Sequence, residues 1–500
     1  MLQKTLVIFI GVAMLGACSE SSDVADATGT ENQSSADNTA QTSVAPVQQT
    51  QPNVLFILLD DMGYGDVGFT GSEIATPNLD EIAADGVVLN RNYVYPICSP
   101  TRAALLTGHN PLDYGIEGPM PDHVGLPLNL KVMPEYFQDM GYQTFMLGKW
   151  HLGIGNTDFW PISRGFDYHY GFLGGWIDFY THMYAGGLDW QRDGKSLREE
   201  GHATDLLTAD ALRVIESRNP DRPFFMYLAY NAPHSPLQTT PSDSGLNSHI
   251  EPGDRKIYAE MVTQTDRGIG QLMDTLEQQG ILENTIVVFS SDNGGDLTQG
   301  ASNVGLRAGK GQAYEGGMRV PGVVRWPGHV DGGTVLEQPI IAYDWLPTLL
   351  DAVGGDAADV ENPYGQSMWA AIADGEQVER RATTIGIAIS RAAFDWPMKL
   401  VRHTDRAPNS ETVVSLFNVL EDPNEENNLA AEMPEKTAEL LALLDVIPDV
   451  SFPPNPGTPL PRPQSFFWNA SGEGWDYEVR VPETLPPWAE AAQRGAKWTD

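Results

Sequence analysis

Four short, largely apolar stretches divide the first three hundred residues, and they lie at 53–59, 141–147, 223–230 and 285–291. Apolar runs of this length are typical of strands that are buried on both faces of a parallel sheet. Residues 204–217 and 258–279 instead place apolar side chains at helical spacing, and Gly280 is suited to end the second helix. Because strands alternate with helices, the pattern predicts an α/β fold with a large, mostly parallel central sheet flanked by helices.

The pattern changes near residue 380 to short alternating segments, such as 383–389 and 413–419, and residues 435–444 then have helical spacing. Five hundred residues suit one large domain with an appendage, or two domains. We therefore predict a main domain over 53–378, a C-terminal subdomain over 379–447 and a Pro-rich extension over 448–500.

The N-terminus has the pattern of an export signal. Residues 1–17 contain a lysine and then an apolar run, Leu6 to Leu15, too short to span a membrane. Residues 15–18, Leu-Gly-Ala-Cys, resemble a bacterial lipobox and predict a lipid on Cys18; the alternative is a cleaved signal in which Cys18 is incidental. Residues 18–52 lack large apolar side chains and predict a disordered tether. We expect an exported lipoprotein, periplasmic or at the cell surface of a Gram-negative bacterium, that meets the membrane through its lipid anchor only.

The charge balance limits the partners. The chain has 30 basic and 67 acidic residues, a formal net charge of −37, and no run of Lys or Arg that could follow a phosphate backbone. Nucleic acid is therefore excluded as an expected partner. An anionic substrate must be attracted by a local basic pocket, because the general field of the protein repels it.

Reactive polar side chains follow each of the four predicted strands, and ligands bind at the carboxyl ends of strands in α/β sheets. An Asp-Asp pair such as Asp60-Asp61 is by itself more typical of a turn or a cap. A second pair, Asp292-Asn293, follows another strand and favours a shared site. Four oxygen ligands suit Ca²⁺ or Mg²⁺ rather than Zn²⁺. The other two strands are followed by Lys149, His151 and His234.

Residues 96–108 contain Cys98, the only cysteine of the chain besides Cys18. Ser99 is a favourable N-cap and Pro100 suits the first helical position, so we predict a short helix that ends near Gly108. Cys98 would lie just ahead of the helix, near its positive dipole end and within about one turn of Arg102. This environment suits a nucleophile and an anion, although a lone cysteine is more often a buried structural thiol.

Several motifs carry a family resemblance. The sequence Cys98-Ser99-Pro100-Thr101-Arg102, followed by small and apolar residues up to Thr107-Gly108, resembles the first signature of the type I, formylglycine-dependent sulfatases. Residues 141–151 resemble the second signature, and residues 314–321 resemble another characteristic stretch. Residues 163–176 and the region of Trp190 are most similar to the arylsulfatase B branch. The resemblance covers about residues 53–447, implies the alkaline phosphatase superfamily, and implies that the C-terminal subdomain is a small antiparallel sheet.

The resemblance also implies a cofactor and a modified residue. Cys98 would be converted to formylglycine by a formylglycine-generating enzyme or an anaerobic maturase. One Ca²⁺ would be held together by the modified residue 98 and by Asp60, Asp61, Asp292 and Asn293. A hydrated aldehyde offers one hydroxyl to attack sulfur and a second to release sulfate.

The same resemblance implies roles for the remaining site residues. Arg102 would support the hydrate and His151 would orient it. Lys149 and Lys310 would hold the sulfate, and His234 would protonate the leaving oxygen. Arg307 lies near Lys310 in the chain and is an alternative to it.

These observations predict a sulfuric ester hydrolase that acts on a sulfated carbohydrate. Trp160, Trp176, Tyr180 and Trp190 offer flat faces on which sugars pack, although aromatic residues at such spacing are often core. Two alternatives remain open. One is a phosphatase or phosphodiesterase of the same superfamily, and the other is a non-catalytic surface lipoprotein that binds glycans.

Overall fold

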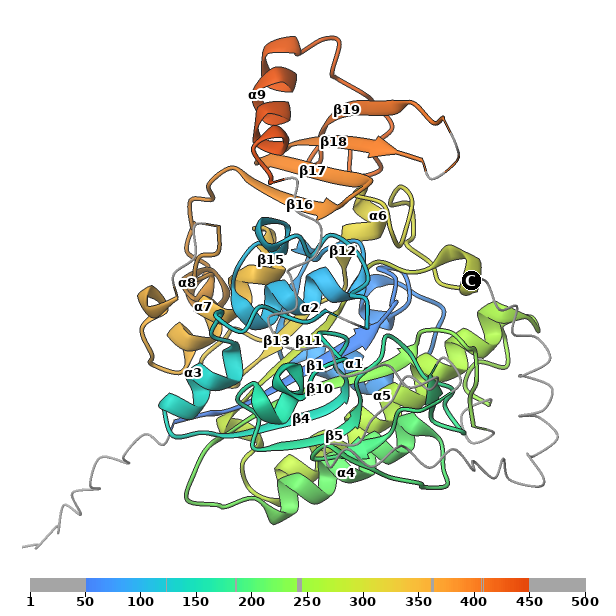
Figure 1. The fold of residues 1–500 in the computed structure, drawn as a ribbon, viewed down its shortest axis with the longest axis vertical. Helices are drawn as coiled ribbons and strands as arrows, with labels where there is room; N and C mark the ends of the chain where they lie inside the picture. Colours follow the sequence, from blue (N-terminus) through green and yellow to red (C-terminus); the bar gives the residue numbers. More distant parts are fainter. Residues whose placement is uncertain are drawn as a thin grey trace, which may run out of the picture. The chain divides into compact units, whose positions relative to one another are not determined.

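The computed structural model describes residues 51–448 except 123, 185–186, 241–244, 361–363, 406 and 408 (Figure 1). The predicted signal peptide, the lipidation site Cys18, nearly all of the tether and all but the first residue of the C-terminal extension lie outside the described residues. Within the described part, none of the helices combines the length and the apolar character needed to cross a bilayer.

A ten-stranded mixed sheet forms the centre of the main domain (Figure 1). Its five middle strands are parallel, in the order β11 (Thr285–Ser291), β1 (Asn53–Asp60), β10 (Phe224–Pro233), β4 (Gln143–Lys149) and β5 (Tyr168–Phe172). Antiparallel pairing begins on either side, at β13 (Val323–Arg325) and β8 (Gln191–Arg192). The α/β fold with a largely parallel centre is therefore confirmed. The sheet is completed by β2 (Val87–Leu89), β14 (Thr334–Leu336) and β9 (Lys195–Ser196).

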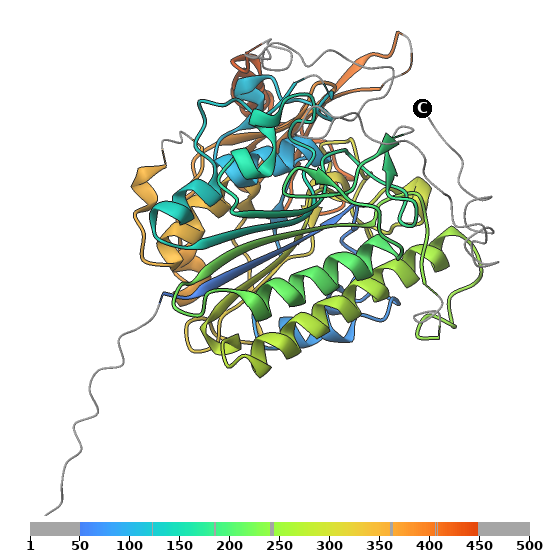
Figure 2. The ribbon, with the colours of Figure 1, turned by 60° about the horizontal axis from the view of Figure 1, so that its bottom comes forward.

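Helices cover both faces of this sheet. On one face α4 (Ala203–Ser217) and α5 (Asp254–Gln278) run side by side, with α1 (Pro77–Ala84) beside α5 (Figure 2). The opposite face carries α2 (Cys98–Thr107), α3 (Met133–Asp139) and α7 (Trp345–Ala352), and α8 (Trp369–Asp374) packs on α7. A three-stranded sheet outside the large one contains β12 (Arg319–Val320), β3 (Asn92–Tyr93) and β15 (Ile340–Ile341), and a separate pair contains β6 (Met183–Tyr184) and β7 (Gly187–Leu188).

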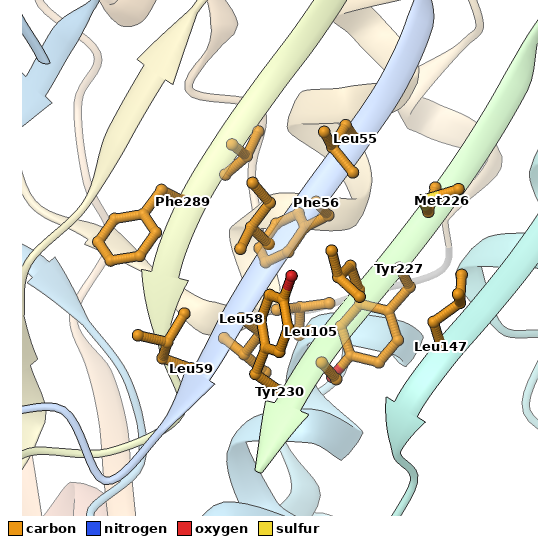
Figure 3. Close-up of a cluster of buried hydrophobic side chains, with 14 of the residues drawn as sticks. Leu55, Phe56, Leu58, Leu59, Leu105, Leu147, Met226, Tyr227, Tyr230 and Phe289 are labelled. Atoms are coloured by element: carbon orange, nitrogen blue, oxygen red, sulfur yellow. The ribbon is translucent and has the colours of Figure 1, made fainter. Parts of the chain in front are cut away.

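The core lies between the middle strands and these helices (Figure 3). Every residue of β1 is buried, which explains why its apolar side chains do not alternate with polar ones. Phe56 of β1 packs edge-on against Trp345 of α7, with ring centroids 5.4 Å apart. Leu105 of α2 joins the same cluster (Figure 3). The first signature helix is thereby fixed against the strand that leads to Asp60.

The C-terminal sheet is an antiparallel meander, as the resemblance implied. It contains β16 (Thr383–Ile387), β17 (Ser390–Asp395), β18 (Met398–Thr404) and β19 (Thr412–Asn418), and α9 (Pro434–Asp445) packs on it (Figure 1). A buried lysine joins this sheet to the main domain. Lys399 Nζ lies 2.9 Å from a carboxylate oxygen of Glu315, in α6 (Glu315–Met318), and 2.9 Å from one of Glu425.

The start of the signature helix differs from the prediction. Helix α2 begins at Cys98, and Ile97 is its N-cap residue without a side-chain cap. The Ser99 hydroxyl instead donates to the carbonyl oxygen of His151 at 3.0 Å and accepts the N–H of Met120 at 2.9 Å. The expected N-cap was therefore wrong, because tertiary contacts engage the hydroxyl inside the first turn.

Candidate active site

The predicted metal ligands and Cys98 meet at the carboxyl edge of the middle strands. β1 and β11 are parallel neighbours with Leu59 opposite Ser291, so Asp60-Asp61 and Asp292-Asn293 leave the sheet side by side. One ligand atom each of Asp60, Asp61, Cys98 and Asp292 can be chosen so that all four lie within 4.8 Å of one another. All four residues are buried.

Three cationic side chains balance the three carboxylates. Arg102 donates to Oδ2 of Asp292 through Nε at 3.0 Å and Nη2 at 2.7 Å, and both side chains are fully buried. Its Nη1 donates to the carbonyl oxygen of Lys149 at 2.8 Å. Lys149 Nζ donates to Asp60 at 2.5 Å, and Lys310 Nζ donates to Asp61 at 2.7 Å. The site thus holds three fixed positive charges that offset its three carboxylates, in a chain that is acidic overall.

The choice between Lys310 and Arg307 is clear from their contacts. Lys310 reaches Asp61, whereas the Arg307 guanidinium lies over the Tyr314 ring, 4.1 Å from its centroid. Arg307 also donates to the carbonyl oxygen of Glu425 at 2.9 Å. Lys310 is therefore the cation that this loop contributes to the cluster.

Burial and mutual repulsion perturb the acidic groups. Burial, with the negative charge of Asp292, raises the pKa of Asp60 to about 7. The same two causes raise the pKa of the Cys98 thiol to about 12. Burial alone would raise the pKa of Asp61, but the charge of Lys310 brings that pKa well below its ordinary value. A bound cation would lower the electrostatic repulsion between carboxylates that lie this close together.

The donor set fits a hard divalent ion. Asn293 donates through Nδ2 to Asp61 at 2.7 Å, and its Oδ1 is buried without a hydrogen-bond partner among the described residues. An unpartnered buried oxygen is unusual unless a ligand completes its surroundings. Together with the oxygens of Asp60, Asp61 and Asp292, it forms the type of ligand set that Ca²⁺ and Mg²⁺ prefer.

Two histidines approach the cluster from other elements. His234, next to the end of β10, donates through Nδ1 to the carbonyl oxygen of Ser235 at 2.6 Å, and its Nε2 lies 3.6 Å from Asp61 Oδ2. Burial, followed by the charge of Lys310, lowers the pKa of His234 to about 3. Its Nε2 is therefore the ring nitrogen that faces the site.

His151, after β4, has a left-handed backbone with φ of +55°. Burial and the charge of Lys149 lower the pKa of its ring well below the ordinary value. A Cβ atom at Gly175 would come within 2.8 Å of this ring, so a glycine is needed there for the loop to approach it.

Comparison with known proteins identifies the family of this chain. The sequence model of the sulfatase family matches residues 52–355, more than half of the chain. The chain belongs to the sulfatase family.

The chain is 37% identical over 338 residues to arylsulfatase J of Mus musculus, a match that covers 65% of this chain and 56% of that protein. It is 34% identical over 331 residues to N-acetylgalactosamine-6-sulfatase of Homo sapiens, covering 61% and 62% of the two chains. The matches thus span less than two thirds of these relatives. Among solved structures, the chain is similar to Ps i-CgsB, whose crystal structure was determined in complex with k-i-k-neocarrahexaose. The two sequences are 33% identical, the TM-score is 0.73, and the match covers 79% of this chain and 92% of Ps i-CgsB.

The expected aromatic platform of this sulfatase-family chain is wrong in part. Trp160 and Trp190 are core side chains with 2% and 0% exposure. Trp190 stacks on the His182 ring with centroids 4.6 Å apart, and its Nε1 donates to Glu199. Trp176 and Tyr180 are half-buried, so only these two of the four present any face to solvent.

Sequence reasoning missed the contribution of the C-terminal sheet. Ile387 of β16 packs in one cluster with Ile97 and Cys98, and Ile389 lies against that cluster. A pocket of about 460 Å³ opens beside it, lined by Ile97, Asp296, Lys310, Gly311, Gln312, Ile389, His403 and Asp405. The C-terminal residues of this lining carry no motif, and their position depends on how the second sheet docks.

Proposed function

We propose that this protein hydrolyses a sulfate ester of a sulfated carbohydrate, with a formylglycine made from Cys98 as the source of the nucleophile. The observation that carries the proposal is the convergence of Cys98 with three cationic side chains and an all-oxygen ligand set at one edge of the sheet. A sulfate ester requires a nucleophile, charge neutralisation and a proton for the leaving oxygen. Each requirement has a matching side chain here.

Asp60, Asp61, Asp292 and Asn293, with residue 98, would hold the divalent ion, which we propose to be Ca²⁺. The formylglycine hydrate would supply the attacking hydroxyl and, through its second hydroxyl, the release of sulfate, while the ion would neutralise charge beside it. A formylglycine-generating enzyme or an anaerobic maturase would have to act on Cys98 first. The side chain of residue 98 would be held in place by Asp60, whose Oδ1 is 3.7 Å from the present Sγ.

The cationic side chains would bind and orient the substrate. Arg102 is anchored by Asp292 and by the Lys149 carbonyl, so its positive charge is fixed beside residue 98. Lys149 and Lys310 would bind the sulfate oxygens, as fixed charges that need little reorganisation during the reaction. His151, buried against the Gly175 loop, would orient the hydrate.

His234 would deliver the proton to the leaving oxygen. Its Nδ1–H is bound to a backbone carbonyl, so Nε2 is the nitrogen available for proton transfer. Burial, and then the positive charge of Lys310, lower the pKa of this ring in the absence of substrate. A bound sulfate would offset that charge and raise the proton affinity of Nε2 when the substrate is in place.

A sulfated carbohydrate is the substrate class best supported by the relatives. One is named an N-acetylgalactosamine-6-sulfatase, and the structural neighbour Ps i-CgsB was solved with a neocarrahexaose. The acidic surface repels long polyanions, which favours short oligosaccharides that enter a local basic site. We assign the catalytic part to residues 53–378 and the accessory subdomain to 379–447.

The decisive test measures sulfate release from sulfated oligosaccharides that contain galactosamine, galactose or fucose. We expect turnover of at least one of these glycans. Turnover of aryl sulfates alone would exclude the carbohydrate assignment. Efficient release of phosphate from phosphate esters, with no release of sulfate, would favour the phosphatase alternative. Binding of the glycans without any turnover would favour the non-catalytic lipoprotein.

Membrane attachment is a separate proposal that rests on the N-terminal sequence alone, since Cys18 lies outside the described residues. We propose that the chain is exported and lipidated at Cys18, and that residues 18–52 tether the enzyme to an envelope membrane. Cys18→Ala is expected to move the protein from the membrane fraction to the soluble envelope fraction, as measured by fractionation and immunoblotting. A variant that stays with the membrane would contradict lipid anchoring at this residue.

A further inference from the structure

The pocket beside Lys310 lies between the two sheets of the protein. Lys310, Gly311 and Gln312 form its main-domain wall, and Ile389, His403 and Asp405 form the wall from the C-terminal sheet. Ile97, the residue before Cys98, is shared by the pocket and the apolar cluster around Cys98. The volume of about 460 Å³ lies within the range of roughly 300–1,000 Å³ that is usual for small-ligand sites. A group bound here would therefore be next to residue 98.

A chain of hydrogen bonds fixes the polar groups of the C-terminal wall. The Ala313 N–H donates to Ser390 Oγ at 2.7 Å, and Ser390 Oγ lies 3.0 Å from Nδ1 of His403. Nε2 of His403 lies 3.1 Å from Oδ1 of Asp405. In the arrangement that satisfies every contact, the Ser390 hydroxyl donates to Nδ1 and Nε2–H donates to Asp405. The buried imidazole thus holds the exposed carboxylate in position.

The remaining lining offers groups that suit a sugar ring. Asp405 has a side chain that is 74% exposed, and the described hydrogen bond from His403 engages its Oδ1, which leaves its Oδ2 able to accept hydrogen bonds from a ligand. Asp296 provides a second carboxylate, and Gln312 provides a half-buried amide at the same wall as Lys310. Ile97 and Ile389 provide apolar surface for ring carbons. A sugar ring presents both hydroxyl groups and C–H faces, so these polar and apolar lining groups suit a carbohydrate.

The walls are also held rigidly against each other. Lys399 of β18 is buried between Glu315, after the Lys310 loop, and Glu425. Glu425 in turn accepts the backbone N–H of Glu315 at 2.7 Å. The loop that carries Lys310 and the strand that carries His403 are therefore joined by a buried ionic network, which preorganises the pocket.

We propose, on the basis of the function proposed above, that this pocket binds the sugar ring that bears the sulfate ester and selects rings that carry no second sulfate. The sulfate of the ester lies toward Lys310, and the ring hydroxyls donate to Asp405 and Asp296. A second sulfate on the ring would meet these two carboxylates and be repelled. The wall from the C-terminal sheet thereby determines which sulfation pattern of the substrate the enzyme accepts.

The test compares Asp405→Asn with the wild-type holoenzyme on two disaccharides, one with a single sulfate and one with a second sulfate on the same ring. We expect kcat/KM for the monosulfated substrate to fall about 10-fold, mainly through KM, because a hydrogen bond to a charged group is lost. We expect the preference for the monosulfated substrate to shrink by a similar factor. Inhibition by inorganic sulfate, which probes the sulfate site alone, should be unchanged.

Asp374→Asn at the exposed end of α8 is the matched control and should behave as wild type. His403→Gln tests the positioning role and is expected to shift the mono-to-disulfated ratio in the same direction as Asp405→Asn. Equal losses on both disaccharides, together with weaker inhibition by sulfate, would overturn the selection. An Asp405→Asn enzyme with wild-type constants would also overturn it. Absence of sulfate release from any substrate by the wild type would instead refute the proposed function.

Discussion

Replacing Cys98 by alanine is expected to lower kcat for sulfate release by about 10⁴-fold or more, because loss of a nucleophile typically removes effects of this size. Alanine cannot be oxidised to the aldehyde, and the neighbouring hydroxyl of Ser99 is engaged by His151 and Met120. The measurement is steady-state sulfate release. It is paired with mass spectrometry of the tryptic peptide from Asn92 to Arg102, which should carry an aldehyde in the active wild type.

Thermal unfolding provides the control for Cys98→Ala. Cys98 shares a small apolar cluster with Ile97 and Ile387, and its Sγ lies 3.7 Å from Asp60 Oδ1, so its replacement should shift the free energy of unfolding by no more than about 1–2 kcal/mol. If the variant is stable but inactive, the loss of activity comes from the missing reactive group and not from unfolding. A fully active wild-type preparation whose peptide contains only intact thiol would refute the formylglycine mechanism.

The edge that carries the site could be predicted from the sequence because the middle strands are buried on both faces. Such strands appear as unbroken apolar runs, and parallel strands present their carboxyl ends at the same edge. The meeting of Asp60 with Asp292 followed from that rule, and β1 and β11 are direct neighbours. The antiparallel strands at the two edges of the sheet could not be predicted from the sequence, because strands such as β8 contain only two residues and show no recognisable pattern.

Local preferences failed where tertiary contacts decide. Ser99 has the side chain of a good N-cap, but its hydroxyl bridges His151 and Met120 across two other segments. Trp160 and Trp190 were candidates for a surface on which sugars pack, but both are core side chains, and Trp160 donates to the carbonyl oxygen of Ile154. Whether an aromatic ring is buried depends on residues that are distant from it in the chain. The local sequence pattern therefore cannot predict its burial.

The pocket between the large sheet and the C-terminal sheet could not be predicted from the sequence, for a related reason. Its wall is assembled from the β16–β17 turn and the end of β18, which approach Ile97 only after the C-terminal sheet has docked. The interactions that fix this docking, above all Lys399 with Glu315 and Glu425, join residues from three distant segments. A lysine at a strand position gives no sign in the sequence that it is fully buried.

Removal of divalent ions by a chelator is expected to abolish sulfate release and to lower the melting temperature. Without the metal ion, ligand atoms of three buried carboxylates and of residue 98 remain within 4.8 Å of one another, and only the side chains of Arg102, Lys149 and Lys310 offset the negative charge. A free metal concentration of 100 times the dissociation constant would add about 2.7 kcal/mol to stability.

Asp292→Asn should also abolish sulfate release, because it removes one of the proposed metal ligands. It should also cost about 3–5 kcal/mol, because the fully buried Arg102 loses its counter-charge. Asp344→Asn is the matched control, since Asp344 is fully buried beside Arg380 but lies outside the site. It should be destabilised while activity and the response to added Ca²⁺ persist, as measured by calorimetry and sulfate release. Full activity in both the chelated wild type and Asp292→Asn would remove the metal from the mechanism.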